Sequence, residues 1–268
     1  MLKDITLGQY FPGDTVAHRL DPRTKILLVV LYIVALFCAK GLLTYGIMAL
    51  ILVICVRISH VQFKALVRGL KPVTFILMFT AILNLFFTSG THNLVEWGFI
   101  HISDTGIHNA IFMVIRIMLL IMGTFLMTYT TSPIALTDGL ERLLNWMKKI
   151  HVPVHELAMM MSIALRFIPT LVEETDKIMC AQKARGADFE SGNIIQRAKA
   201  LIPILVPLFI SAFRRADELA TAMECRCYHG GEGRTKLHVL KYEGRDFMAL
   251  TLGLLITVGV IVLSRFGL

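Results

Sequence analysis

Charged residues are scarce in this sequence, and their scarcity limits what the protein can be. Asp, Glu, Lys and Arg make up 17% of the 268 residues, against about 25% in a typical soluble domain. Hydrophobic residues make up 56%, and the mean hydropathy is +0.68. This composition excludes an intrinsically disordered chain, a coiled-coil rod and an ordinary soluble enzyme.

Acidic residues are scarcer than basic ones. The chain has 27 Lys and Arg against 19 Asp and Glu, a net charge of +8. The cations lie between long apolar runs and not on a water-soluble module, so we expect no nucleic-acid partner. High hydrophobicity with a basic excess indicates a polytopic membrane protein whose charges lie mainly on the cytoplasmic side.

Motifs for catalysis and for cofactor binding are also missing. The cysteine count of five is odd, and Cys38 and Cys55 lie inside apolar runs, so we expect no disulfide framework. The glycine-rich stretch 230–236 lacks the Gly-Lys-Ser/Thr ending of a phosphate-binding loop, and we interpret it as a flexible loop. The spacing Cys225-x-Cys227-x-His229 is tighter than usual zinc spacing and has no second ligand pair. We therefore expect no metal, no cofactor and no catalytic residue on this chain.

Apolar runs predict an all-α membrane protein with about five transmembrane helices, judged against the ~20 residues that cross a bilayer. The runs cover 26–39, 42–56, 72–88, 106–131 and 247–263. The first two could form one long helix, but about 31 residues would exceed the hydrocarbon core, so we prefer two.

The basic residues predict the orientation in the membrane. Sixteen of the 27 lie between Arg142 and Arg245, whereas the loop 89–105 has none. The positive-inside rule then places the N-terminus, the loop 57–71 and the segment 132–245 in the cytoplasm. We divide the chain into an N-terminal membrane domain (1–131), a cytoplasmic domain (132–245) and a C-terminal transmembrane helix (246–268).

The segment 132–245 predicts a layer of about three long amphipathic helices, over 133–148, 155–183 and 193–224. The first begins at Ser132-Pro133, which is a helix-start signal. Prolines at 169, 203 and 207 should bend the other two. Apolar residues three and four apart form a stripe on each long helix: Leu157, Met161, Ala164, Ile168, Leu171 and Ile178 on one, and Leu201, Leu205, Leu208, Ala212, Leu219 and Met223 on the other.

The two long helices end alike. One closes with AQKARG at 181–186 and the other with AMECRC at 222–227, so each has an Arg between small residues. Arg185 is flanked by Ala184 and Gly186, and Arg226 by Cys225 and Cys227. A guanidinium without bulky neighbours can enter a groove on another protein and bind carboxylates or helix-end carbonyls.

Two polar residues fall inside predicted spans. Arg116 either has a functional role within the membrane or is accommodated structurally, by reaching the outer surface or by pairing with a neighbouring helix. Asn84 is better interpreted as a hydrogen-bonding link between helices than as a substrate ligand.

The order of these motifs resembles the transmembrane T component of energy-coupling factor transporters, the CbiQ-like family of vitamin-importing ABC systems. The matching blocks are HRLDPRTK at 18–25, TSP at 131–133, ALRFIPTL at 164–171 and AQKARGAD at 181–188. The second arginine motif departs from the family, because Cys225-Arg226-Cys227 replaces the frequent Ala-Arg-Gly.

The resemblance implies a non-catalytic scaffold subunit in a prokaryotic cell membrane. It implies two cytoplasmic ABC ATPases that form a heterodimer, carry ATP and magnesium and dock on Arg185 and Arg226. It also implies a separate membrane-embedded substrate-binding subunit, for which we expect contact with the apolar faces of the coupling helices, at Leu157, Met161, Ala164, Ile168, Leu205 and Leu208. The alternative from the residues alone is a self-sufficient channel or permease lined by Arg116 and Asn84. An intramembrane enzyme would need paired carboxylates, a His–metal site or a Ser–His pair in the spans, which are lacking.

Overall fold

The computed structural model describes residues 10–87, 93–97, 100–189, 193–231, 235 and 239–266, and the chain divides into two compact units. We call Gly8–Gly139 with Leu240–Leu268 the bundle unit, and Leu140–Val239 the hairpin unit. Each unit is described by itself.

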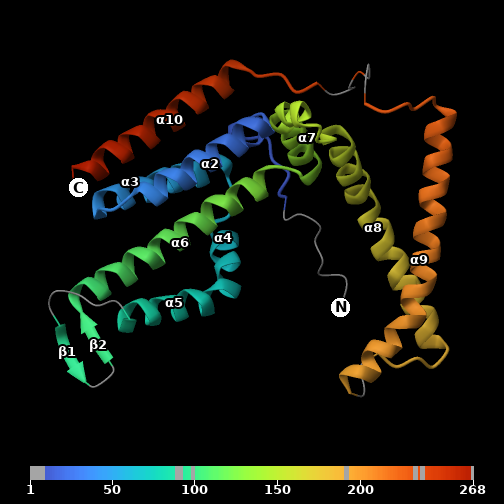
Figure 1. Cartoon of the computed structure of the whole chain (residues 1–268), viewed down its shortest axis with the longest axis horizontal. Coiled ribbons are helices and arrows are strands. Elements are labelled where there is room, and N and C mark those ends of the chain that lie inside the picture. Colours follow the sequence, from blue (N-terminus) through green and yellow to red (C-terminus); the bar gives the residue numbers. More distant parts are fainter. Residues whose placement is uncertain are drawn as a thin grey trace. The chain divides into compact units, whose positions relative to one another are not determined.

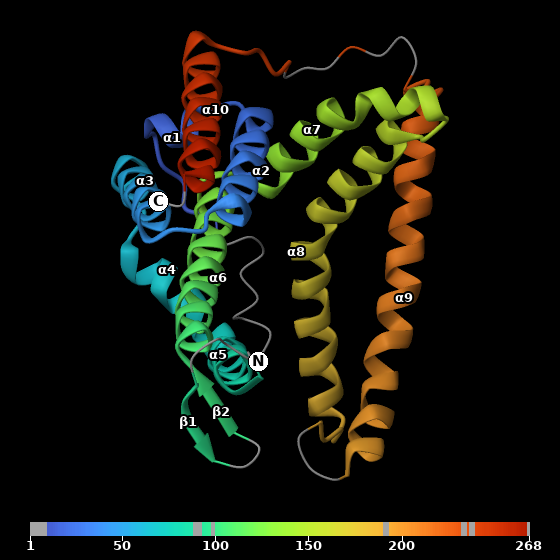
Figure 2. The same ribbon diagram turned by 60° about the vertical axis from the view of Figure 1, so that its left-hand side comes forward.

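The bundle unit is a set of apolar helices (Figures 1 and 2). Its elements are α1 (Val16–Arg19), α2 (Pro22–Cys38), α3 (Leu42–Ser59), α4 (Phe63–Leu70), a 3-10 turn (Lys71–Val73), α5 (Thr74–Phe87), β1 (Asn93–Trp97), β2 (Ile100–Ser103), α6 (Asp104–Thr130), most of α7 (Pro133–Leu143) and α10 (Gly244–Arg265).

The region 26–56 forms two helices, as predicted. Helix α2 ends at Cys38 and α3 begins at Leu42. Gly41 precedes α3 in an extended conformation, and its backbone N–H donates to Thr44 Oγ1 at 3.1 Å. This bond partners an N–H at the helix start, so the chain can turn without leaving the amide unpaired.

Helix α10 packs along α2 although more than 200 residues separate them in sequence. Ser264 Oγ donates to Cys38 O at 2.7 Å near the last turns of both helices, and the Asp21 N–H donates to Asp246 Oδ1 at 2.9 Å near the first turns. The two helices are therefore parallel. Such bonds suit helices in lipid, where apolar contact alone gives little drive to associate. The buried core joins α2, α3, α6 and α10 through residues such as Leu36, Met48, Leu119 and Val260.

The loop expected between the third and fourth spans contains a short antiparallel hairpin. Strands β1 and β2 pair from Trp97 opposite Ile100 to Asn93 opposite Ser103, with a register shift between Asn93 and Val95. Residues 88–92 and 98–99 of that loop lie outside the described residues. This β-hairpin was not predicted from the sequence, because its two strands have only five and four residues.

The hairpin unit contains two long helices that run side by side in opposite directions (Figures 1 and 2). A 3-10 segment (Leu144–Ile150) leads to α8 (Val154–Ala184), which is followed by α9 (Ile194–Cys225). Both helices continue through their internal prolines at 169, 203 and 207. The predicted bounds of 155–183 and 193–224 are therefore correct to within one residue at each end.

The prediction of an all-α membrane protein is confirmed. Six helical segments in the described part of the chain are long and apolar enough to cross a membrane: α3, α4 with α5, α6, α8, α9 and α10. Among them α8 and α9 have the lowest mean hydropathy. Helix α2 has 17 residues, one fewer than the shortest of these six segments, and it packs in the bundle core.

Candidate functional site

The first arginine motif forms a regular C-terminal cap on α8. Gly186 has a left-handed φ of 89°, and its N–H donates to Lys183 O at 3.0 Å. The Ala187 N–H donates to Gln182 O, also at 3.0 Å. These two bonds define a Schellman motif, in which Arg185 is the C-cap residue and Gly186 supplies the positive φ.

The second motif forms the same cap on α9 although it lacks glycine. Cys227 has a φ of 56°, and its N–H donates to Glu224 O at 2.8 Å. The Tyr228 N–H donates to Met223 O at 3.0 Å, so Arg226 is again the C-cap residue. The departure of the sequence from Ala-Arg-Gly therefore leaves the geometry of the cap unchanged, and Cys227 carries a conformation that L-residues rarely adopt.

Both arginines are exposed at their helix ends. In the described part of the chain, neither the Arg185 nor the Arg226 guanidinium makes a hydrogen bond or an ion pair. Each guanidinium therefore has five donors available to a partner. The flanking positions Ala184, Gly186, Cys225 and Cys227 are exposed as well, so no bulky side chain covers the approach.

The two arginines lie at opposite ends of the α8–α9 pair. Gln182 near the end of α8 faces Pro203 near the start of α9, with Nε2 3.5 Å from the carbonyl oxygen. At the other end, Gly231, a few residues beyond Arg226, lies against the ring of His155 at the start of α8. Gln182 opposite Pro203 and Glu174 opposite Ser211 put Arg226 level with position 159 of α8, 26 residues before Arg185. At ~1.5 Å per residue, the two tips are therefore about 40 Å apart.

A polar cluster links the two helices near their middle. Glu174 on α8 accepts a hydrogen bond from Ser211 Oγ and another from Arg215 Nη2 at 3.0 Å, both on α9. Since one carboxylate binds two side chains of the other helix, the cluster fixes their register as well as their proximity. This cluster cannot be recognised in the sequence, because no short motif contains its three members.

The predicted contact residues for a membrane partner remain accessible on the hairpin unit. Leu157, Met161, Ala164 and Leu205 are exposed, and Ile168 and Leu208 are partly buried. The most exposed apolar row lies one position further along α9, at Ile202, Val206, Phe209 and Phe213, with Phe213 69% exposed. Those four are spaced by four, three and four residues, so they share a face that the predicted stripe did not include.

No metal site forms in the part of the chain that the structure describes. No three His, Cys, Asp or Glu side chains there could hold an ion together, and this includes Cys225, Cys227 and His229. In the glycine-rich stretch, Glu232, Gly233, Arg234 and Lys236 lie outside the described residues.

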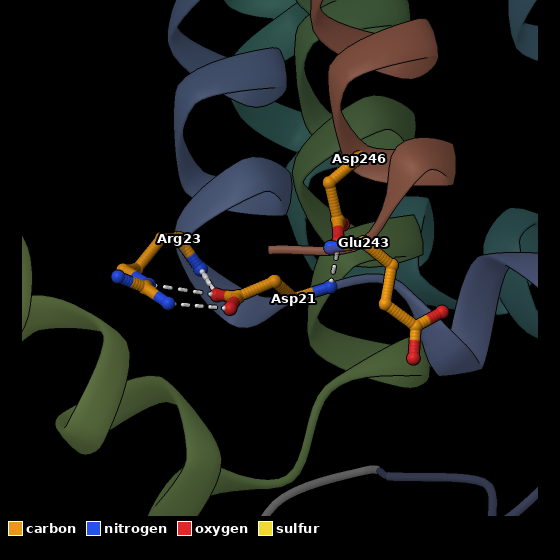
Figure 3. Close-up of polar contacts among 4 residues, drawn as sticks. All are labelled: Asp21, Arg23, Glu243 and Asp246. Atoms are coloured by element: carbon orange, nitrogen blue, oxygen red, sulfur yellow. Dashed lines mark hydrogen bonds and ion pairs between the residues drawn. The ribbon is translucent and has the colours of Figure 1, made fainter. Parts of the chain in front are cut away.

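The HRLDPRTK block forms a junction in the bundle unit, where α2 and α10 begin (Figure 3). Asp21 caps α2 by accepting from the Arg23 N–H at 2.9 Å, and it also pairs with the Arg23 guanidinium, with Nη2 at 2.8 Å. The hydrogen bond with Asp21 raises the pKa of Arg23, which precedes the predicted span. Asp246 accepts from the N–H groups of Asp21 and Glu243, at 2.9 and 2.8 Å. The block therefore holds the start of α10 beside the start of α2.

Arg116 on α6 pairs with the neighbouring helices. Its Nε donates to Tyr45 Oη at 2.8 Å, and its Nη2 donates to Ala39 O at 3.1 Å. Ala39 is the C-cap of α2, so a cation meets the negative end of that helix. Of the readings left open, internal pairing is the one that the geometry supports.

Asn84 on α5 links two helices, as expected. Its Nδ2 donates to Thr80 O and to the Met113 sulfur on α6, both at 2.9 Å. With Arg116 bound to α2 and α3, neither polar residue is left to line a path through the bundle.

Known proteins resemble this chain over almost its full length. A family profile described as cobalt transport protein (CbiQ) matches residues 13–237. A protein from Clostridium kluyveri named energy-coupling factor transporter transmembrane protein EcfT is 56% identical over 266 residues, 99% of this chain and 98% of its own length. Proteins of the same name from Acidaminococcus fermentans and Bacillus subtilis are 54% and 49% identical, over 100% and 92% of this chain and 96% and 93% of their own lengths.

Fold and similarity together define a multi-pass α-helical membrane component of a transporter. More particularly, the chain belongs to the CbiQ family. The relatives described above are named transmembrane proteins of energy-coupling factor transporters. The expected family membership is thereby confirmed.

Proposed function

We propose that this chain is the scaffold that couples ATP hydrolysis by two cytoplasmic ABC ATPases to vitamin or micronutrient uptake by a separate membrane subunit. The observation that carries the proposal is the pair of identical Schellman caps, each with an exposed arginine that is unpaired among the described residues. Arg185 docks in one ATPase and Arg226 in the other. ATP and magnesium are held by the ATPases, and this chain has no catalytic residue.

The spacing of the two tips supports one ATPase at each. Two tips about 40 Å apart are too far apart to enter one groove, and each presents the same chemistry at the end of a long helix. Because the Glu174–Ser211–Arg215 cluster joins α8 and α9, movement of one tip is passed to the other helix. Closure of the ATPase pair on ATP would therefore change the angle between α8 and α9.

The exposed apolar side chains of the hairpin unit form the contact for the substrate-binding subunit. The predicted residues Leu157, Met161 and Leu205 are exposed, and so is the row that ends at Phe213. A surface of this kind on a protein with a basic, cytoplasmic coupling segment indicates a membrane-embedded partner. We place the N-terminus and the hairpin unit on the cytoplasmic side of a prokaryotic cell membrane.

Charge reversal at the tips tests the proposal. We expect Arg185→Glu and Arg226→Glu each to weaken co-purification with the ATPases, and the double variant to abolish it, because a carboxylate would face the acceptors that bound the guanidinium. The measurement is a pull-down from cells that express the chain with its ATPases.

Arg214→Glu is the matched control, because Arg214 is an exposed cation on α9 away from either tip. Elution of all variants at the wild-type volume in gel filtration would show that the chain is folded. If the folded double variant retained its ATPases in full, the docking role of the two arginines would be wrong.

A further inference from the structure

An apolar cavity of about 330 Å³ lies within the bundle unit. Residues of α1, α2, α3, α6 and α10 line it, and most of them are apolar. The hydroxyls on its wall are already bonded within the chain: Tyr32 to Leu119 O, Thr130 to Leu126 O, and Thr257 to Gly253 O. The cavity therefore suits a hydrocarbon better than water or a polar solute.

One charged side chain, Lys25, reaches this wall. It is 7% exposed, and its Nζ donates to Thr130 O at 2.8 Å and to His18 O at 3.2 Å. An ammonium has three donors, so one remains. No carboxylate pairs with Lys25 in the described part of the chain, and both oxygens of the nearby Asp246 carboxylate accept backbone N–H groups. Burying a cation without an anion is costly.

The cavity has a charged end at Lys25 and extends from there along α2. The lining follows α2 from Lys25 to Ala35, a distance of about 15 Å along the helix. Lys25 lies at the end where α2 begins and α6 ends. Arg19 on α1 and Arg57 in the last turn of α3 are exposed there, and neither is hydrogen-bonded or ion-paired within the described residues.

We propose that this cavity is a binding site for one anionic glycerophospholipid of the surrounding bilayer. One acyl chain fills the apolar cavity between α2, α3, α6 and α10. The headgroup phosphate accepts a hydrogen bond from the remaining N–H of the Lys25 ammonium and lies near Arg19 and Arg57. The volume is at the lower end of the ~300–1,000 Å³ of ligand pockets, which fits one chain and leaves the second in the bilayer.

Lipid retention by the purified full-length chain tests the site. We expect wild type, after exhaustive washing in detergent, to keep about one phospholipid per chain, and phosphatidylglycerol to be enriched over the membrane average. Phosphate assay and mass spectrometry of extracted lipid measure both quantities. Cys55→Phe, which fills the cavity from α3, and Lys25→Met should each lose most of this lipid.

Ile54→Phe and Lys64→Met are the matched controls. Ile54 is exposed on the same helix as Cys55 but does not line the cavity, and Lys64 is an exposed cation on α4. Both controls should keep the wild-type amount. Loss in the controls equal to that in the test variants, or retained lipid with the average membrane composition, would reduce the site to ordinary lipid contact and overturn the proposal.

Unmodified chain provides a test that needs no variant. Cys55 lines the cavity, whereas Cys180 on α8 does not. Adding phosphatidylglycerol to delipidated chain in detergent should slow maleimide labelling of Cys55 several-fold and leave that of Cys180 unchanged. Equal protection by phosphatidylcholine would contradict the role of the cations, and no protection by either lipid would contradict the site.

Discussion

At the scale of single residues, the two arginine motifs share a backbone geometry as well as a charged side chain. Arg185 and Arg226 occupy the same position in two Schellman caps, although glycine follows one and cysteine the other. The sequence predicted both arginines at matching helix ends. It could not predict that Cys227 adopts the same left-handed conformation as Gly186, because cysteine carries no propensity for positive φ.

Substitutions at Cys227 should follow the cost of its left-handed conformation. We expect Cys227→Gly to raise the free energy of unfolding by up to about 1 kcal/mol and Cys227→Val to lower it by about 1–2 kcal/mol. The melting temperature should move in the same direction in each case. Thermal unfolding of the purified chain in detergent measures both. Cys225→Val, at a helical position in the same motif, should change stability less than Cys227→Val, and the reverse order would contradict the assigned cap.

Arg116 shows how much a single intramembrane charge depends on its neighbours. From the sequence it could be a functional group or an internal pair, because the chain alone does not show what faces it. Its partners come from Tyr45 on α3 and from Ala39 at the end of α2, both more than 70 residues away in sequence.

Removal of the Arg116 contacts should destabilise the bundle unit. We expect Arg116→Met to cost about 1–2 kcal/mol, since hydrogen bonds between membrane helices contribute roughly 0.6–2 kcal/mol each. Tyr45→Phe should cost less, and the double variant should cost less than the two single variants together. Unfolding in detergent measures the three values. Strict additivity would contradict the direct Arg116–Tyr45 bond.

At the scale of elements, the helix bounds were largely predictable and the pairing of helices was not. Long apolar stripes and caps such as Ser132-Pro133 determine where a helix begins and ends. The hairpin of β1 and β2 was missed because it is short, and the Ile202–Phe213 row was missed because a helix that is apolar on several sides offers more than one stripe. Which face is covered depends on the partner helix and not on local sequence.

The Glu174 cluster should hold α8 against α9. We expect Glu174→Ala to widen the distance distribution between spin labels placed on the two helices, because Ser211 and Arg215 would lose their common acceptor. Pulsed electron paramagnetic resonance of the labelled chain measures it. Glu173→Ala is the matched control, since Glu173 is an exposed acid one position away, and an equal effect there would show that the cluster does not set the pairing.

At the scale of the whole molecule, the two units divide the work of a transporter subunit. In the bundle unit, Arg116, Asn84 and the junction of Asp21 with Asp246 are bonded between helices. The hairpin unit instead exposes two arginine tips and an apolar surface. Coupling between subunits, and not conduction through this chain, is the function that this division supports.

Uptake into proteoliposomes tests that claim most directly. Vesicles would hold the chain alone, the chain with its ATPases and substrate-binding subunit, or the same complex with Arg185→Glu and Arg226→Glu, and accumulation of the radiolabelled vitamin bound by that subunit would be measured with ATP supplied on the ATPase side. We predict ATP-dependent uptake by the wild-type complex only. Uptake by the chain alone, or full uptake by the doubly substituted complex, would contradict the account.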